Sequence, residues 1–183
     1  GTQDYYPAVS AGLNVIHYSS SGIQPKSYPI TGSPLADHFM LVYTGKSHHS
    51  GMNNFEVLKA AVQKDSNTLK ALVDIKRIAQ KMETAVISQQ WSLLPDLFNE
   101  EFEARVRLAP AFTSPEIEEL SKITLEAGAQ AVKICGAGGG GCILVWCPPD
   151  YKERVAQACQ KQNFQVMSAR PIDPQENPLQ KSF

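Results

Sequence analysis

Apolar residues recur along this chain with two different spacings, which separate strand-like stretches from helix-like ones. Residues 13–18 alternate between apolar and polar side chains, as a half-buried strand does, whereas residues 39–43 and 142–146 are short continuous apolar runs. Because these runs are bounded by turn residues and rich in β-branched and aromatic side chains, they predict strands. Residues 19–37 are rich in serine, glycine and proline and predict a loop with one short strand at 27–31.

Four stretches carry apolar residues at spacings of three and four, which is typical of amphipathic helices. The four stripes are Phe55, Leu58, Ala61 and Val62; Leu72, Ile75, Ala79, Met82 and Val86; Trp91, Leu94, Phe98, Phe102 and Val106; and Ile117, Leu120, Ile123 and Ala127. We expect each stripe to face the core. Ser114, followed by Pro115, is a typical start for the last of these helices, and Gly128 is a typical end.

A further helix from Asp150 to residue 160 and a strand at residues 164–169 complete the pattern. The order of strand, helices, strand, strand, helix and strand suits an antiparallel or mixed sheet with helices packed on one face. The sequence therefore predicts an α+β fold with one principal domain. Residues 171–183 carry three prolines and few apolar groups, so we expect a frayed tail.

The most unusual stretch is Gly136–Gly141, which lies between two apolar runs and has five glycines in six positions. It matches G-x-G-x-x-G, but a dinucleotide-binding loop is followed by a helix, and here a strand follows. We therefore expect strand, glycine-rich turn, strand. Consecutive backbone N–H groups in such a turn can bind an anion, which makes the segment a candidate phosphate loop. The alternative is a hairpin without a ligand, although two residues suffice for a hairpin turn.

Composition excludes several classes of partner. The 183 residues contain 17 basic and 18 acidic side chains and no basic block, so we do not expect a nucleic-acid partner. No apolar stretch approaches the roughly 18 to 20 residues that cross a bilayer, and no signal sequence is present, so we expect a cytoplasmic protein without a membrane partner. The four cysteines form no C-x-x-C pair and are expected to be reduced thiols rather than zinc ligands.

Two polar stretches are candidates for chemistry. The loop after residues 39–43 carries hydroxyls and histidines that could bind a phosphorylated or polyhydroxylated ligand; its candidate residues are Thr44, Gly45, Ser47, His48 and Ser50. A solvated loop with incidental histidines is the alternative. Asp4 lies where the chain opens with a short helix or turn, and from the sequence pattern alone a helix-capping role is favoured over catalysis.

Residues 133–142, Lys-Ile-Cys-Gly-Ala-Gly-Gly-Gly-Gly-Cys, closely resemble the third motif of the GHMP kinases. Residues 1–8, 41–50 and 107–110 are similar, in the same order, to the heptose-phosphate and galactokinase-like members of that family. The resemblance implies ATP-dependent phosphoryl transfer, with Mg2+, to a hydroxyl of a sugar or sugar phosphate. It also implies a ferredoxin-like C-terminal domain, which we place at residues 38–173, followed by a flexible tail at 174–183.

The resemblance assigns roles to the candidate residues. Asp4 would be the catalytic base that accepts or orients the hydroxyl proton, and the loop from Thr44 to Ser50 would line the sugar side. The phosphate or nucleotide loop would be formed by Gly136, Ala137, Gly138, Gly139, Gly140 and Gly141. Related kinases often carry an arginine where this chain has His48 and His49, which leaves the substrate open.

One family motif does not occur in this sequence. GHMP kinases carry a Pro-x-x-x-Gly-Leu-Gly-Ser-Ser type loop for the ATP phosphates in an N-terminal domain, and residues 1–37 look like the remainder of that domain. ATP and Mg2+ would require the missing lobe, so we expect the chain alone to be a poor kinase or none. A stand-alone metabolite-binding or regulatory domain is the alternative, and a homodimer stays open.

Overall fold

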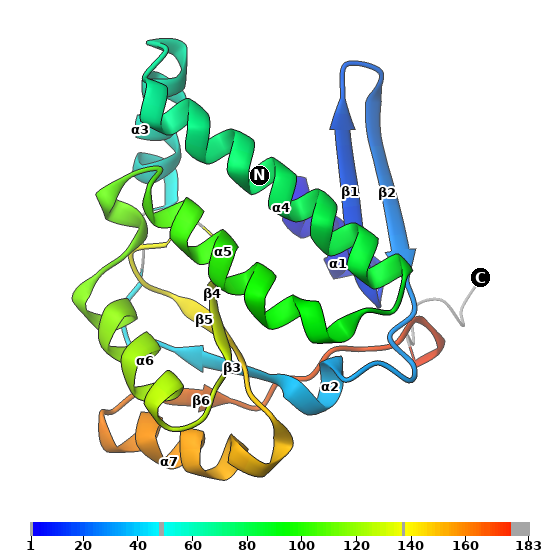
Figure 1. Ribbon diagram of the computed structural model, residues 1–183, viewed down its shortest axis with the longest axis vertical. Helices are drawn as coiled ribbons and strands as arrows, with labels where there is room; N and C mark the ends of the chain where they lie inside the picture. The colour runs from blue at the N-terminus through cyan, green and yellow to red at the C-terminus, as the bar shows by residue number, and fades with distance from the viewer. Residues whose placement is uncertain (1, 48–49, 137, 177–183) are drawn as a thin grey trace. The chain divides into compact units, whose positions relative to one another are not determined.

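A four-stranded antiparallel sheet lies at the centre of residues 37–169. Its strands are β3 (Phe39–Tyr43), β4 (Ala131–Ile134), β5 (Cys142–Trp146) and β6 (Gln165–Met167). They pair in the order β4-β5-β3-β6, with every neighbouring pair antiparallel (Figure 1). Helices separate β3 from β4 and β5 from β6, while β4 and β5 form a hairpin. This is the ferredoxin-like arrangement, and the expected α+β class is confirmed.

The computed structural model describes residues 2–47, 50–136 and 138–176. Two compact units are formed, one from residues 1–36 together with 170–183 and the other from residues 37–169. The second unit contains the sheet and the glycine-rich segment. Each unit is described by itself below.

The helices of the second unit follow β3 in a long run. They are α3 (Ser50–Val62), α4 (Ser66–Ile87), η2 (Trp91–Leu93), α5 (Leu94–Val106), η3 (Pro110–Phe112) and α6 (Pro115–Glu126), with η4 (Pro149–Tyr151) and α7 (Lys152–Lys161) after β5. As predicted, the Ser114 side chain accepts a hydrogen bond from the N–H of Ile117, and Pro115 occupies the first turn of α6. No helix in the described ranges is both long and apolar enough to cross a membrane.

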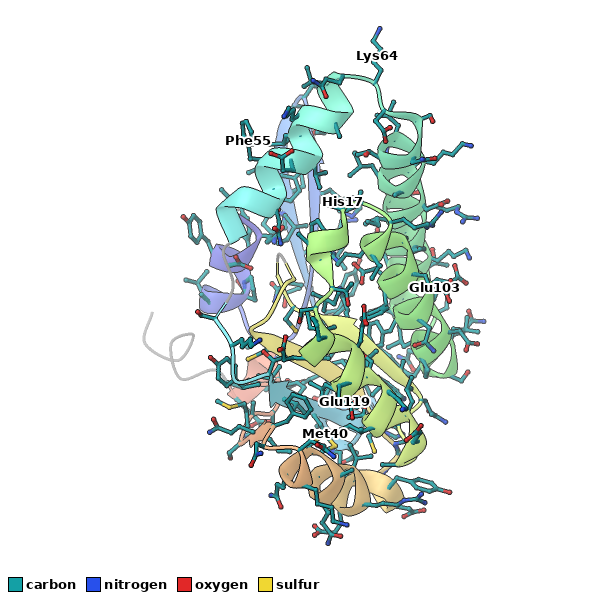
Figure 2. The ribbon with its side chains drawn as sticks, turned by 90° about the vertical axis from the view of Figure 1, so that its left-hand side faces the viewer. His17, Met40, Phe55, Lys64, Glu103 and Glu119 are labelled. Carbon is teal, nitrogen blue, oxygen red and sulfur yellow. The ribbon has the colours of Figure 1, made fainter. Side chains whose placement is uncertain are left out.

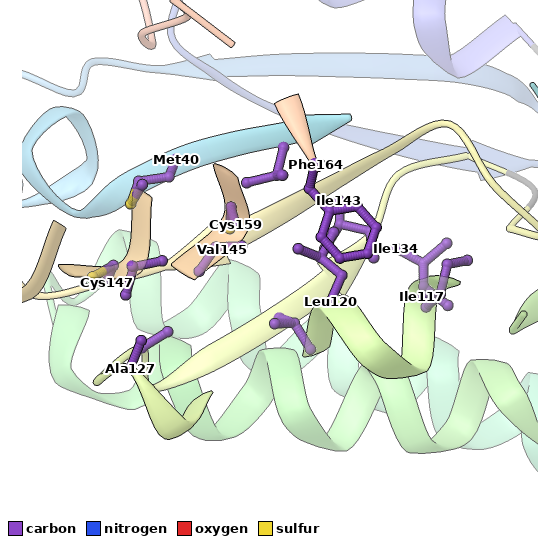
Figure 3. Packing of buried hydrophobic residues seen from close by; sticks show 14 residues of the cluster. Met40, Ile117, Leu120, Ala127, Ile134, Ile143, Val145, Cys147, Cys159 and Phe164 are labelled. Carbon is purple, nitrogen blue, oxygen red and sulfur yellow. The ribbon is translucent and has the colours of Figure 1, made fainter. Parts of the chain in front are cut away.

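The main core fills one face of the sheet. It consists of Met40, Val42, Ile117, Leu120, Ala127, Ala129, Val132, Ile134, Ile143, Val145, Cys147, Val155, Cys159 and Phe164 (Figure 3). These residues come from alternate strand positions and from α6 and α7, as the two-residue period of a strand requires. Burying each of the larger aliphatic side chains contributes about 1.5–3 kcal/mol before entropy losses. The expected helices on one face are therefore α6 and α7.

Helix α5 contacts side chains of the opposite face of the same sheet. The ring of Phe98 lies 6.2 Å from that of Phe39 and 6.0 Å from that of Trp146. Glu101, one turn further along α5, pairs with Lys133 on β4. Phe39, Lys133 and Trp146 alternate with the core residues along their strands, so α5 adds a second helical layer.

Two of the predicted helix stripes do not form buried faces. Phe55, Leu58 and Val62 of α3 are exposed, whereas Val57 is buried. Phe55 projects outward in Figure 2. In α4 the buried face runs through Ala71, Ile78, Ala85 and Val86, while Leu72 is exposed. A helical period shows that one face is apolar, but it does not show which face meets a partner. The sequence analysis built the stripe of α4 mainly from large apolar residues, whereas small alanines, which allow helices to approach closely, form part of the buried face.

Residues 2–36 form η1 (Thr2–Asp4), α1 (Tyr5–Val9) and an antiparallel hairpin of β1 (Leu13–Ser19) and β2 (Gly22–Tyr28), and α2 (Leu35–His38) leads into β3. The prediction of a loop over 19–37 with a strand at 27–31 was wrong, because the strand begins at Gly22. Strand β2 is almost entirely exposed and contains Pro25. It therefore shows none of the apolar alternation by which strands are found.

The segment before residue 177 is held in place rather than frayed. One carboxylate oxygen of Asp173, Oδ2, accepts hydrogen bonds from the N–H groups of Ile30 and Thr31 at 3.0 and 2.8 Å and from the Thr31 hydroxyl at 2.7 Å. The N–H of Gly12 donates to the carbonyl of Ile172 at 2.7 Å. The Thr31 hydroxyl, helped by the backbone donors, holds the pKa of Asp173 below its usual range. Residues 170–176 are thus an integral part of the first unit.

Candidate functional site

The candidate site is the glycine loop, Gly136–Gly141, which joins β4 to β5 at one end of the sheet. The N–H of Cys135 donates to the carbonyl of Cys142 at 3.2 Å and closes the base of the loop. Strand, glycine-rich turn and strand occur as predicted. Ala137 lies outside the described residues.

One flank of the glycine loop is pressed against η3. A Cβ atom on Gly138, which has a φ of 69°, would lie 2.2 Å from the carbonyl oxygen of Phe112. The same carbonyl accepts a hydrogen bond from the N–H of Gly139 at 3.2 Å. Only glycine allows both this backbone angle and this approach. Part of the glycine content therefore serves contact with the protein's own backbone.

The other flank of the glycine loop meets the segment after β3. A Cβ atom on Gly140 would lie 2.9 Å from the carbonyl oxygen of Lys46 and 3.1 Å from that of Ser47. The N–H of Gly141 donates to the Lys46 carbonyl at 2.8 Å, and the carbonyl of Gly141 accepts bonds from the N–H and hydroxyl of Thr44 at 2.9 and 3.0 Å. The glycine loop and the segment that carries the candidate sugar-side residues are thus brought together.

Three described N–H groups of the glycine loop, those of Gly136, Gly138 and Gly140, are left over by these contacts, and Gly136 is exposed. Gly138 and Gly140 are buried, yet no oxygen of residues 2–47, 50–136 or 138–176 accepts a hydrogen bond from their N–H groups. More than nine in ten buried backbone N–H groups in proteins have a partner. The N–H groups of Gly138 and Gly140 are thus exceptions to this rule among the described residues.

The candidate sugar-side residues differ in what their side chains can do. Thr44 is 4% exposed, and its hydroxyl donates to Gly141, so in this conformation it fastens the glycine loop. Gly45 and Ser47 are exposed. Ser50 is the first residue of α3. His48 and its neighbour lie outside the described residues.

Asp4 belongs to the first unit, whereas the glycine loop belongs to the second. It is exposed, ends η1 and stands at the N-cap position of α1. Its side chain makes no capping hydrogen bond. Asp4 thus stands at the start of a helix, as the sequence pattern predicted, although without a capping hydrogen bond, and the catalytic role remains a proposal.

A charged network beside the glycine loop was missed by the sequence analysis. Glu101 of α5 is 4% exposed and pairs with Arg105 on the same helix and with Lys133 of β4. The Lys133 ammonium lies 3.0 Å from Oε2 of Glu101. Burial would raise the pKa of the Glu101 carboxyl, but Lys133 and Arg105 outweigh it and hold that pKa below its usual range. The sequence did contain one signal for this network, a lysine within a strand of buried apolar residues.

A separate cavity of about 570 Å3 opens between α4 and α5. It is lined by Arg77, Gln80, Lys81, Thr84, Ala85, Gln90, Leu93, Asp96, Leu97 and Glu100. None of the candidate residues contributes to it. Across the described ranges, no three His, Cys, Asp or Glu side chains gather in a way that could hold a metal ion.

Two curated proteins resemble this chain in sequence. It is 24% identical over 170 residues to a D-glycero-alpha-D-manno-heptose 7-phosphate kinase of Campylobacter jejuni, an alignment covering 91% of this chain and 50% of that protein. It is 26% identical over 145 residues to a probable glucuronokinase 2 of Arabidopsis thaliana, covering 76% and 38%. The chain thus spans half or less of the length of these sugar kinases.

The fold also occurs in solved kinases. The crystal structure of L. major mevalonate kinase in complex with R-mevalonate matches with a TM-score of 0.71 at 15% identity, covering 88% of this chain and 50% of that one. A family model described as GHMP kinases C terminal matches residues 74–165, from within α4 to the start of β6, and so includes the glycine loop. The chain therefore belongs to the GHMP kinase family.

Proposed function

We propose that this chain is the C-terminal part of a kinase that transfers the γ-phosphate of ATP to a hydroxyl of a sugar or sugar phosphate. Within it, the glycine loop would bind phosphate through the N–H groups of Gly138 and Gly140. The observation that carries this proposal is that Gly138 and Gly140 are buried residues whose N–H groups receive no acceptor from the described residues.

Phosphate oxygens suit such donors for an electrostatic reason. A buried N–H without an acceptor forfeits a hydrogen bond to water, which costs about 1–3 kcal/mol, and a charged acceptor recovers more than that. The carbonyls of Phe112 and Lys46 already bind Gly139 and Gly141, so the loop is held while the intervening donors stay open. A fixed donor array of this kind stabilises charge without reorganising.

The relatives support a sugar or a sugar phosphate as the substrate class. A heptose 7-phosphate kinase aligns over 91% of this chain, and a probable glucuronokinase over 76%. We therefore assign the acceptor to a sugar carrying several hydroxyls, with or without a phosphate. Gly45 and Ser47 are exposed beside the loop and could contact it.

Asp4 is proposed as the group that accepts or orients the proton of the attacking hydroxyl. Its carboxylate makes no capping bond and is exposed, which leaves it available. Across the described residues, no cluster of metal ligands occurs. We propose that Mg2+ is bound together with ATP, which would require the N-terminal lobe, and that it would neutralise the charge of the phosphates.

The test is a titration followed by NMR on the chain labelled with 15N-glycine. The chain has twelve glycines, so the spectrum is simple enough to assign. Mg-ATP, a heptose phosphate and inorganic phosphate are titrated separately. We expect the amide signals of Gly138 and Gly140 to shift with at least one phosphate compound, while that of Gly32, in the first unit, stays unchanged.

A shift confined to the loop would support the phosphate site, and the tightest probe would name the ligand class. The Gly139→Val variant should abolish the shift, since its side chain would press on the carbonyl of Ala111, 3.1 Å from the Cβ position. Unchanged loop signals with all three compounds at millimolar concentration would overturn the proposal.

A further inference from the structure

Arg105 of α5 contacts the glycine loop at its start and, through a second segment, at its middle. Its Nη1 donates to the carbonyl of Gly136 at 3.3 Å. Its guanidinium also lies 5.9 Å from the centre of the Phe112 ring, within the range of a cation–π contact. Phe112 is the residue whose carbonyl binds the N–H of Gly139. One side chain thus restrains both Gly136 and the segment that fixes Gly139.

The guanidinium is itself held in one orientation. Its Nε and Nη2 both donate to Oε1 of Glu101, the former at 2.7 Å. The other oxygen of Glu101 faces the Lys133 ammonium at 3.0 Å. Lys133 lies on β4, three positions before Gly136. The network therefore starts on β4, passes through α5 and returns to the glycine loop.

The side chains of this network are largely buried. The side chain of Glu101 is 6% exposed and that of Arg105 is 21% exposed, so solvent screens the ion pairs only partly. Glu103 lies on the same helix but projects away from the sheet (Figure 2). The planar guanidinium can bind Glu101, the Gly136 carbonyl and the Phe112 ring together, whereas an ammonium is a single point charge. Lysine at position 105 could therefore keep the ion pair but not the full set of contacts.

We propose that Arg105 is a positioning residue, oriented by Glu101 and Lys133, that sets the direction of the glycine-loop N–H groups. The inference deepens the proposed function, because it names the group that prepares the loop for phosphate. It also stands apart from that function, because loop order can be measured without any ligand.

The experiment compares Arg105→Lys and Arg105→Gln with Arg107→Gln in the full chain. Arg107 is the matched control, since it pairs with Asp74 on α4, and no hydrogen bond or ion pair joins its side chain to the described residues of the loop. Amide exchange at Gly139 is measured against strand amides of β5 without ligand, and the affinity for inorganic phosphate is measured by titration. We expect exchange at Gly139 to accelerate about tenfold in both Arg105 variants, with the strand amides unchanged.

Phosphate affinity should fall by roughly tenfold in the Arg105 variants and stay unchanged in Arg107→Gln. In Lys133→Arg, exchange at Gly139 should stay slow, because the variant retains the charge that faces Glu101. In Lys133→Met, which lacks that charge, exchange at Gly139 should accelerate. Equal acceleration of exchange at all amides of Arg105→Lys would mean general destabilisation and would overturn the inference. Exchange at Gly139 that is as slow in the Arg105 variants as in the unmodified chain would also overturn it. If only Gly139 accelerates and the unmodified chain binds no phosphate, the positioning role stands and the proposed function fails.

Discussion

The Cβ position of Gly138 lies 2.2 Å from the carbonyl oxygen of Phe112. Phosphate binding alone therefore does not account for a glycine at this position. The glycine loop is wedged between two backbone segments of its own unit, and the closeness of that fit decides which of its N–H groups stay open.

Gly138→Ala should destabilise the second unit strongly, by about 3 kcal/mol or more, because left-handed strain and a backbone clash add together. Gly45→Ala is the matched control. Gly45 has a similar φ of 81°, but no atom lies within 4 Å of its Cβ position, so the expected cost is about 1–2 kcal/mol of strain. Urea unfolding of both variants checks this. Equal losses would contradict the close contact with Phe112.

Glu101 should make the stability of the second unit depend on pH. Its pKa is lower in the folded chain than in the unfolded chain, so its contribution is fully present above the usual value of 4.5 and is lost as the pH falls. Glu101→Gln should cost about 1–3 kcal/mol at neutral pH, because Lys133 and Arg105 lose their counter-ion. It should also flatten the decline in unfolding free energy between about pH 5 and about pH 3.

Glu103→Gln supplies the control for that measurement, since Glu103 is exposed on the same helix. Its curve of unfolding free energy against pH should run parallel to that of the unmodified chain. A Glu101→Gln curve that also runs parallel would show that Glu101 does not titrate with a lowered pKa.

Two cysteines should resist alkylation until the chain unfolds. Cys147 and Cys159 are fully buried, and burial raises the pKa of both thiols, that of Cys159 to about 11. Because the thiolate is the reactive form, iodoacetamide should modify the half-buried Cys142 before either of them. Mass spectrometry after timed labelling gives the order. Early labelling of Cys159 in the folded chain would contradict the packing of α7 against the sheet.

Helix α3 offers a direct test of its orientation. Val57 is 9% exposed and Phe55 is 59% exposed. Val57→Ala should therefore cost about 1–2 kcal/mol, whereas Phe55→Ala, which removes the larger side chain, should stay within about 0.5 kcal/mol. Thermal unfolding of the two variants shows whether α3 buries the face with Val57 or the apolar stripe with Phe55 that the sequence pattern favours. A larger loss for Phe55→Ala would support the stripe.

The sheet and the helices that cap it were largely predictable from local pattern. The Ser114 cap and the apolar runs of β3 and β5 depend on neighbours within a few residues, so sequence spacing contains the information. Strand β2 was not predictable in the same way, since it is exposed and its residues carry no apolar alternation.

The glycine loop was identified from the sequence, but its surroundings were not. Spacing could not show that the Thr44 hydroxyl is used by Gly141, because these residues lie 97 positions apart. Nor could it show that Arg105 and Lys133 meet at one carboxylate. Such contacts depend on the pairing of strands and on the face that α5 presents, which local pattern does not determine.

The hydrogen bonds of Asp173 impose an order on folding during synthesis. Residues 37–169 are continuous, so a ribosome delivers them before Asp173 exists, and they can fold as one body. The N–H groups of Ile30 and Thr31, made earlier, must stay hydrated until Asp173 arrives. Residues 2–36, which are translated before the sheet, are therefore completed after it.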